Sequence, residues 1–176
     1  MTAEFEALGV DAVIAAAGAI AKAIRGKHRI YICGNGGSAA DAQHIAGELV
    51  GRFAMERRAL PAMALTTDTS VVTCIANDYG YEDIFSRQVE AFAGKGDVLW
   101  AISTSGRSAN ILSAARLARK KGVVVLALTG RKNSELEKIA DISLCAENKS
   151  SARSQEIHQL AYHIICGLVE EKIFGK

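Results

Sequence analysis

Short apolar runs alternate with longer segments of helical composition along this chain, and this alternation most restricts the fold that it can adopt. Each run is four to six residues long and almost free of charge. Strands that are apolar nearly throughout are typical of a parallel sheet whose two faces are both covered by helices. The predicted strands span residues 29–33, 61–65, 97–102, 123–128 and 142–145.

The segments between these runs predict helices. The first, residues 3–25, is rich in alanine and apolar on most sides, so we expect it to pack against another subunit. No repeat or linker divides the 176 residues, which indicates a single α/β domain over residues 1–176 with a five-stranded parallel sheet. The other predicted helices span residues 38–53, 71–76, 81–93, 108–121, 134–140 and 151–174.

Charge and composition argue against several classes of function. The net charge of +2 is near balance, and the basic clusters at Arg57–Arg58 and 119–121 are short, so we expect them on solvated surface and not against nucleic acid. The four cysteines lie in apolar runs without a C-x-x-C motif, which indicates buried free thiols in a reducing compartment. Glu4 and Glu6 stand where a signal peptide is basic, and no apolar stretch reaches the ~20 residues of a membrane span. We therefore expect a cytoplasmic protein.

A glycine-rich loop, residues 34–38, joins the first predicted strand to the helix after it. Its glycines allow the backbone to approach a ligand, the helix start offers free N–H groups to an anion, and Ser38 is the predicted N-cap. A dinucleotide site is the alternative, since Ala39 stands at the third position of the glycine fingerprint and Asp68 lies beyond the second strand. That match is loose, and both interpretations stay open at this point.

A second loop, residues 103–108, carries four hydroxyl side chains and a glycine between the third strand and its helix. Hydroxyls and backbone N–H groups can donate to phosphate oxygens, and a helix N-terminus favours their negative charge. A capped turn is the alternative interpretation, because Ser and Thr are common in turns. In a parallel sheet both loops lie beyond the carboxyl ends of strands, where ligands bind.

Two predicted helices carry residues that can bind a metal. His44 and Glu48 are four residues apart and share a helix face, while Gln155 and His163 lie on a broad face of the closing helix. Nitrogen and oxygen ligands of this kind suit zinc, although Gln is an unusual ligand. The alternative for His44 and Glu48 is an ordinary surface pair.

Taken together, these residues resemble the phosphoheptose isomerases, a branch of the sugar-isomerase (SIS) domain family. The resemblance extends from about Tyr31 to Phe174, and Arg107 and Ala109 depart from it where the family often has Asn and Pro. The departures flank the hydroxyl loop and concern substrate detail more than chemistry. The stretches that carry the resemblance are residues 33–53, 64–78, 85–89, 97–106 and 151–163.

The resemblance implies a flavodoxin-like three-layer sandwich and a homotetramer with active sites at subunit interfaces, to which the N-terminal helix contributes. It implies conversion of sedoheptulose 7-phosphate to D-glycero-D-manno-heptose 7-phosphate, an early step toward the ADP-heptose of bacterial lipopolysaccharide. It also implies one zinc ion per subunit, held by His44, Glu48, Gln155 and His163. The substrate-binding residues that it implies are Asn35, Gly36, Gly37, Ser38, Asn77, Asp78, Ser103, Thr104, Ser105, Ser108 and Gln155.

For the chemistry, our hypothesis takes Glu48 as the base that moves a proton between C1 and C2, His163 as its acid partner, and Asp78 as an aid to ring opening. A non-catalytic SIS adaptor for protein partners such as a replication initiator is the main alternative. The family's adaptors lack the acid/base Glu and the second His that are present here as Glu48 and His163. An aminosugar-phosphate isomerase or a sugar-phosphate sensor is a further alternative.

Overall fold

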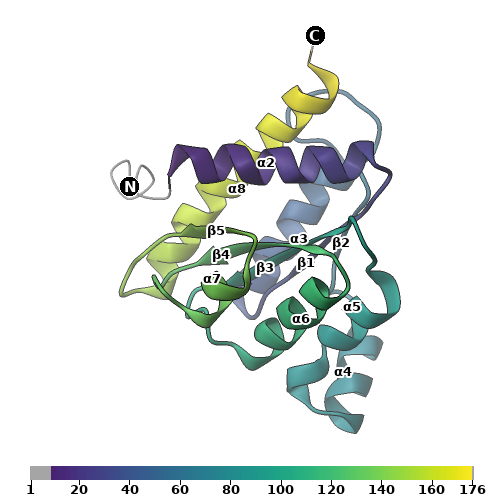
Figure 1. Ribbon diagram of the computed structural model, residues 1–176, viewed down its shortest axis with the longest axis vertical. Coiled ribbons are helices and arrows are strands. Elements are labelled where there is room, and N and C mark those ends of the chain that lie inside the picture. The colour runs from purple at the N-terminus through teal and green to yellow at the C-terminus, as the bar shows by residue number, and fades with distance from the viewer. Residues whose placement is uncertain (1–8, 176) are drawn as a thin grey trace.

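The computed structural model describes residues 9–175. A five-stranded parallel sheet of order β2-β1-β3-β4-β5 lies between two layers of helices, which confirms the predicted fold class (Figure 1). Because β1 and β3 are neighbours whose chains continue in opposite directions across the sheet, the loops that follow them flank a topological switch point. The strands are β1 (Ile30–Cys33), β2 (Ala62–Ala64), β3 (Val98–Ser103), β4 (Val124–Thr129) and β5 (Ile142–Cys145).

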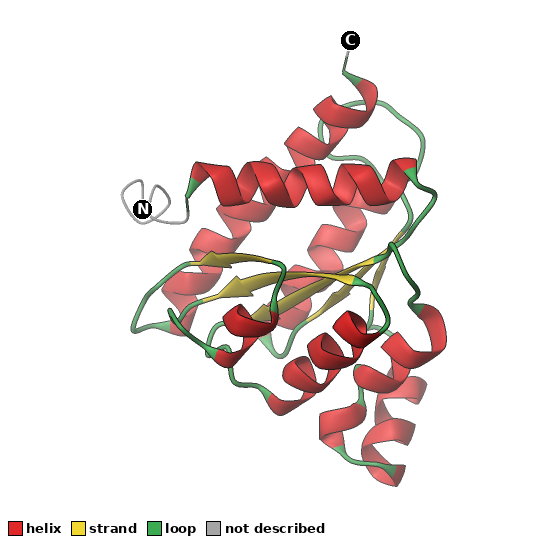
Figure 2. Ribbon diagram, viewed as in Figure 1, coloured by secondary structure: helices red, strands yellow, loops and turns green. Residues whose placement is uncertain are grey.

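Helices α2 (Val10–Arg25), α3 (Gly37–Val50) and α8 (Ser151–Phe174) cover one face of the sheet, and α8 packs against both of the others (Figure 2). The shorter elements cover the opposite face. They are α4 (Thr69–Asp78), the 3-10 turn η1 (Tyr81–Asp83), α5 (Ser86–Phe92), α6 (Ala109–Lys120) and α7 (Glu135–Ile139).

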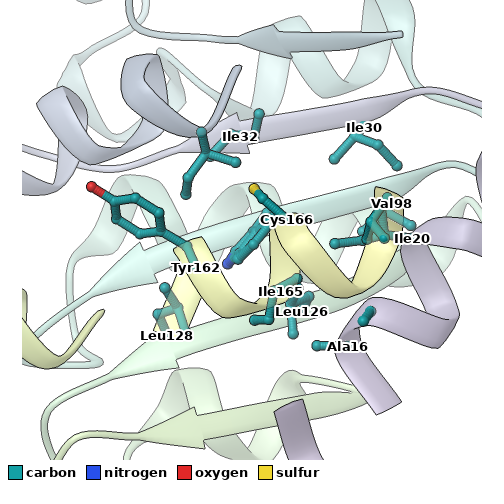
Figure 3. Packing of buried hydrophobic residues seen from close by; sticks show 14 of the residues in the cluster. Ala16, Ile20, Ile30, Ile32, Val98, Leu126, Leu128, Tyr162, Ile165 and Cys166 are labelled. Atoms are coloured by element: carbon teal, nitrogen blue, oxygen red, sulfur yellow. The ribbon is translucent and has the colours of Figure 1, made fainter. Parts of the chain in front are cut away.

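Alternating strand residues divide the core into two halves. Ile30 and Ile32 face α2, α3 and α8, while Tyr31 and Cys33 face the other layer. Figure 3 shows the first half, in which side chains of α8 such as Ile165 pack against the strands. Each large apolar side chain buried in this way stabilises the fold by roughly 1.5–3 kcal/mol, so α8 is fixed firmly to the sheet.

Several boundaries differ from those predicted. The segment 81–93 is a 3-10 turn and a separate helix, and α3 ends at Val50 instead of residue 53. The predicted helix 3–25 corresponds to α2 from Val10: Gly9, with φ of 82°, is its N-cap and not part of the helix, and residues 3–8 lie outside the described residues. Cys74 is exposed, against expectation, because α4 buries only Ile75 fully and turns its other side outward. Among the described helices, none combines the length and apolar composition needed to cross a membrane.

Candidate active site

The seam between α3 and α8 holds polar contacts at three successive levels. Both helices follow strands of a parallel sheet on the same face, so they run in the same direction. Gln155 lies near Ser38 at the first level, and His163 lies near His44 at the second. At the third level, Glu170 binds the backbone of the chain that follows α3. Residues more than a hundred positions apart in sequence therefore meet in order along one line.

The middle level brings together His44, Glu48 and His163. The His44 Nε2 atom is 2.9 Å from Glu48 Oε1 and 3.4 Å from His163 Nε2. The side chains of His44 and Glu48 are 39% and 21% exposed, so both are partly accessible to solvent. A carboxylate and two imidazoles in such proximity are the groups that general acid–base catalysis most often uses.

Neighbouring aromatic side chains fix the two imidazole rings. The Tyr162 hydroxyl is 2.9 Å from His44 Nδ1, which leaves His44 Nε2 directed at Glu48 and His163. Phe53 stacks on the His163 ring, with centroids 5.5 Å apart and an angle of 24° between the planes. Burial, together with the nearby Asp41 carboxyl, raises the pKa of Tyr162, so this hydroxyl stays protonated.

The three side chains fit a divalent metal. One ligand atom from each of His44, Glu48 and His163 lies within 4.8 Å of the other two. Tetrahedral zinc with ligands at about 2.0–2.1 Å requires ligand atoms roughly 3.3 Å apart, close to the 3.4 Å between the two Nε2 atoms. The Tyr162 contact at the other His44 nitrogen is the type of support that oriented metal ligands receive.

Gln155, the fourth predicted ligand, lies at the first level of the seam. Its Nε2 is 3.5 Å from the Ser38 hydroxyl, and its amide packs against Gly37 so closely that a Cβ there would clash with it. Eight residues separate Gln155 from His163, about 12 Å along a helix. Gln155 therefore lies between the glycine loop and the His/Glu/His group.

The glycine loop after β1 is tied to α6 across the switch point. Asn35 and Asn110 exchange two side-chain hydrogen bonds of 2.9 and 2.8 Å, and the Tyr81 hydroxyl donates to Asn35 at 3.0 Å. The prediction of Ser38 as N-cap is wrong, because α3 begins at Gly37 after Gly36, whose φ of 55° suits glycine. A cavity of about 110 Å³, lined in part by Asn35 and Gly36, lies beside this loop.

The hydroxyls of the loop after β3 converge on one another. Ser103 Oγ is 3.3 Å from Ser105 Oγ and 3.0 Å from Ser108 Oγ. Ser108 is the N-cap of α6, yet its side chain makes no capping bond, and the Ile111 N–H in the first turn donates to Asn110 Oδ1 at 2.9 Å instead. Thr104 turns away and donates to Ser151 at 3.2 Å. The loop therefore presents clustered donors and a helix start, which suits an anion.

Asn77 and Asp78 lie elsewhere. They end α4, on the face of the sheet opposite α3 and α8, and the Asn77 amide donates to the Asp78 carboxylate at 2.8 Å. Both side chains are exposed. Within one chain the structure does not bring them to the His/Glu/His group.

Sequence reasoning missed Tyr162, Phe53, Glu170 and the role of Arg57. The prediction that Arg57 lies on solvated surface is wrong, because its side chain is 2% exposed and pairs with Glu170. Glu170 lies seven residues after His163 and so on the same helix face, but this spacing does not identify Arg57 as its partner.

The fold and the site together define a sugar-phosphate-handling α/β domain, and the comparisons agree. A family model described as SIS domain matches residues 1–130, so this chain belongs to the SIS domain family.

Within that family, the chain is similar to proteins named phosphoheptose isomerase. It is 55% identical over 148 residues to the one from Burkholderia pseudomallei strain 1710b, covering 84% of this chain and 75% of that protein. It is 49% identical over 162 residues to the one from Geobacter metallireducens, covering 92% and 86%. A solved structure of the phosphoheptose isomerase from Neisseria gonorrhoeae superposes with a TM-score of 0.91 at 41% identity, covering 97% and 91%.

Proposed function

We propose that the chain is an aldose–ketose isomerase that converts sedoheptulose 7-phosphate to D-glycero-D-manno-heptose 7-phosphate in the cytoplasm, toward the ADP-heptose of lipopolysaccharide. The observation that carries this proposal is the meeting of His44, Glu48 and His163 in a chain 55% identical to a phosphoheptose isomerase. An adaptor that only binds proteins has no need for a carboxylate and two imidazoles within 4.8 Å of one another.

The substrate needs two kinds of contact, and the site offers both. The hydroxyls of Ser103, Ser105 and Ser108 and the start of α6 hold the phosphate. The glycine loop, with Asn35, and Gln155 bind the sugar between the phosphate and the His/Glu/His group. Binding the distant phosphate supplies free energy that positions the reacting carbons.

The chemistry is a proton transfer through an enediol. Glu48 removes the proton from C1 of the ketose and returns it to C2, while His163 moves the proton between the two oxygens. A zinc ion held by His44, Glu48 and His163 would stabilise the negative oxygen as a Lewis acid. Gln155, whose amide contacts Ser38 in this structure, would have to turn toward the group to serve as the fourth ligand. Asp78, which lies on the opposite face of its own subunit, reaches the sugar only from a neighbouring subunit, where it aids ring opening.

This arrangement requires an oligomer, and we propose a homotetramer with active sites at subunit interfaces. The single domain spans residues 1–176, and its N-terminal helix contributes to the contacts between subunits. Val10 and Ile14 on α2 are 62% and 46% exposed in the single chain, which gives that helix an apolar surface to bury.

The test is to incubate the purified protein with sedoheptulose 7-phosphate in D₂O and to follow the sugar by NMR. We expect a new aldose 7-phosphate that carries deuterium at C2, and exchange at C1 of the remaining ketose. Absence of product, with and without added zinc, would contradict the proposal and favour the adaptor or another sugar phosphate.

A further inference from the structure

A buried ion pair holds the segment that follows α3, residues 51–58. Arg57 and Glu170 have side chains only 2% and 1% exposed, with 2.9 Å between Arg57 Nε and Glu170 Oε1. The other arginine–carboxylate ion pairs among the described residues lie on the surface. In Arg116–Glu135, for example, both side chains are 56% exposed. The Arg57–Glu170 pair is therefore the one that solvent does not screen.

The Glu170 carboxylate binds the segment through its backbone. It accepts hydrogen bonds from the N–H groups of Phe53, Ala54 and Met55 at 2.9, 2.9 and 2.8 Å. Burial alone would raise the pKa of Glu170, but these three donors and Arg57 outweigh it and lower the pKa below 4.5. Glu170 is thus a fixed anion around which three consecutive residues turn.

The Arg57 guanidinium binds the end of α3. It donates to the backbone carbonyls of Glu48, Leu49 and Gly51 at 2.7, 2.8 and 3.0 Å. The last carbonyls of a helix have no partner within it, and a cation there is favoured by the helix dipole. Arg57 therefore fixes the final turn of α3, in which Glu48 lies.

Both halves of the pair act on the candidate active site. Arg57 holds the backbone of Glu48, while Glu170 holds the backbone of Phe53, whose ring stacks on His163 at 5.5 Å. Glu170 also lies on α8 with His163, two helical turns and about 10 Å further along. Neither Arg57 nor Glu170 touches the reacting atoms, yet together they join the segments that carry Glu48 and His163.

We propose that Arg57 and Glu170 are positioning residues that keep Glu48 and His163 aligned across the α3–α8 seam. This inference rests on the proposed function and extends it to residues outside the site. An ion pair that served stability alone would lower the melting temperature when broken but leave kcat of the folded protein unchanged. A positioning pair must also affect kcat, because a displacement of ~1 Å can cost about 10²-fold in rate.

The experiment compares Glu170→Gln with Glu135→Gln, which removes the charge from a surface pair. We measure kcat, KM and zinc affinity, the last with a competing chelator, at a temperature where circular dichroism finds every variant folded. For Glu170→Gln we expect kcat to fall at least about tenfold with KM within about threefold, and zinc to bind about tenfold more weakly. Glu135→Gln should match the parent protein.

If Glu170→Gln does not fold, Phe53→Leu takes its place, since it keeps the ion pair and removes only the ring from His163. We then expect kcat to fall about threefold or more. Unchanged kcat and zinc affinity in the folded variant, whatever its melting temperature, would overturn the inference. If the parent protein itself does not isomerise the sugar, the proposed function fails, and the zinc affinities alone decide whether the pair positions the site.

Discussion

The α3–α8 seam and the 103–108 loop contribute to the same candidate site, but their geometry depends on different distances along the chain. In the loop, Ser103, Ser105 and Ser108 meet within six residues, at the end of one strand. In the seam, His44 and His163 are 119 residues apart and meet only because two helices pack on one face of the sheet. The comparison separates a candidate anion site that one turn can build from a candidate proton-transfer site that requires the whole core.

The sharpest way to test this division is to remove the Glu48 carboxylate from the seam. We expect Glu48→Gln to lower kcat by about 10²–10⁴-fold with little change in KM, because a general base acts in the transition state and not in binding. Steady-state kinetics on protein shown to be folded by circular dichroism measure it. A fall of only two- or threefold would remove Glu48 from this role.

Metal removal tests the same region without a mutation. We expect protein stripped by a chelator to lose on the order of 10²-fold in kcat, as when one electrostatic stabiliser of a transition state is lost. Zinc should restore the rate and magnesium should not, since imidazole ligands suit zinc. Full activity in protein shown by elemental analysis to be free of metal would make the metal incidental.

A substitution in the hydroxyl loop should change KM, whereas a substitution in the seam should change kcat. Ser103→Ala removes one donor to the phosphate, so we expect KM to rise about tenfold while kcat changes much less. Ser113→Ala, in the same helix region but outside the loop, is the matched control. If KM for the sugar phosphate stays the same in Ser103→Ala, the hydroxyl cluster does not hold the phosphate.

The smallest effect concerns His158, which shares α8 with His163 but points into the core. It is fully buried with its Nε2 2.9 Å from the Thr129 carbonyl, and burial lowers its pKa below 6.5. The unfolded chain then binds this proton more readily, so the stability of the parent protein should fall as pH drops below about 6.5. We expect His158→Gln to lack that part of the decline, which is at most about 1.4 kcal/mol per pH unit.

Urea unfolding of both proteins between pH 7.5 and 5 measures this difference, with His28→Gln as a control on a partly exposed histidine. Parallel stability curves for the parent protein and His158→Gln would show that His158 does not titrate with unfolding. Unchanged kcat in His158→Gln would indicate that His158, unlike His163, takes no part in the reaction.

The sequence predicted the parts of the fold that depend on local pattern. All five strands were found, because each is a short, mainly apolar run and the first four are followed by glycine or polar residues, and α8 has the predicted bounds. The start of α3 was misplaced because Ser38 has the composition of an N-cap, while Gly36 with φ of 55° allows the helix to begin earlier. Local residue preference does not reveal that backbone angle.

The sequence predicted the reactive residues of the candidate site but not the buried residues that hold them in place. His44 and Glu48 share a helix face by spacing alone, so their contact could be expected. The burial of Arg57 could not, because its partner lies 113 residues away and nothing in the pair Arg57–Arg58 distinguishes the buried residue from the exposed one. Long-range pairing of charges is the information that a single sequence lacks.

The seam has a consequence for the order in which the protein is made. Ribosomes add about 5–20 residues each second, so roughly 6–24 s separate the synthesis of His44 from that of His163. By the end of that interval the glycine loop, the hydroxyl loop and all five strands have been synthesised, but until residue 163 is added no nascent chain holds both imidazoles. The His/Glu/His group is therefore complete only once α8 has been made, and a polypeptide that stalls just before α8 has the loops proposed to bind phosphate and sugar but lacks His163.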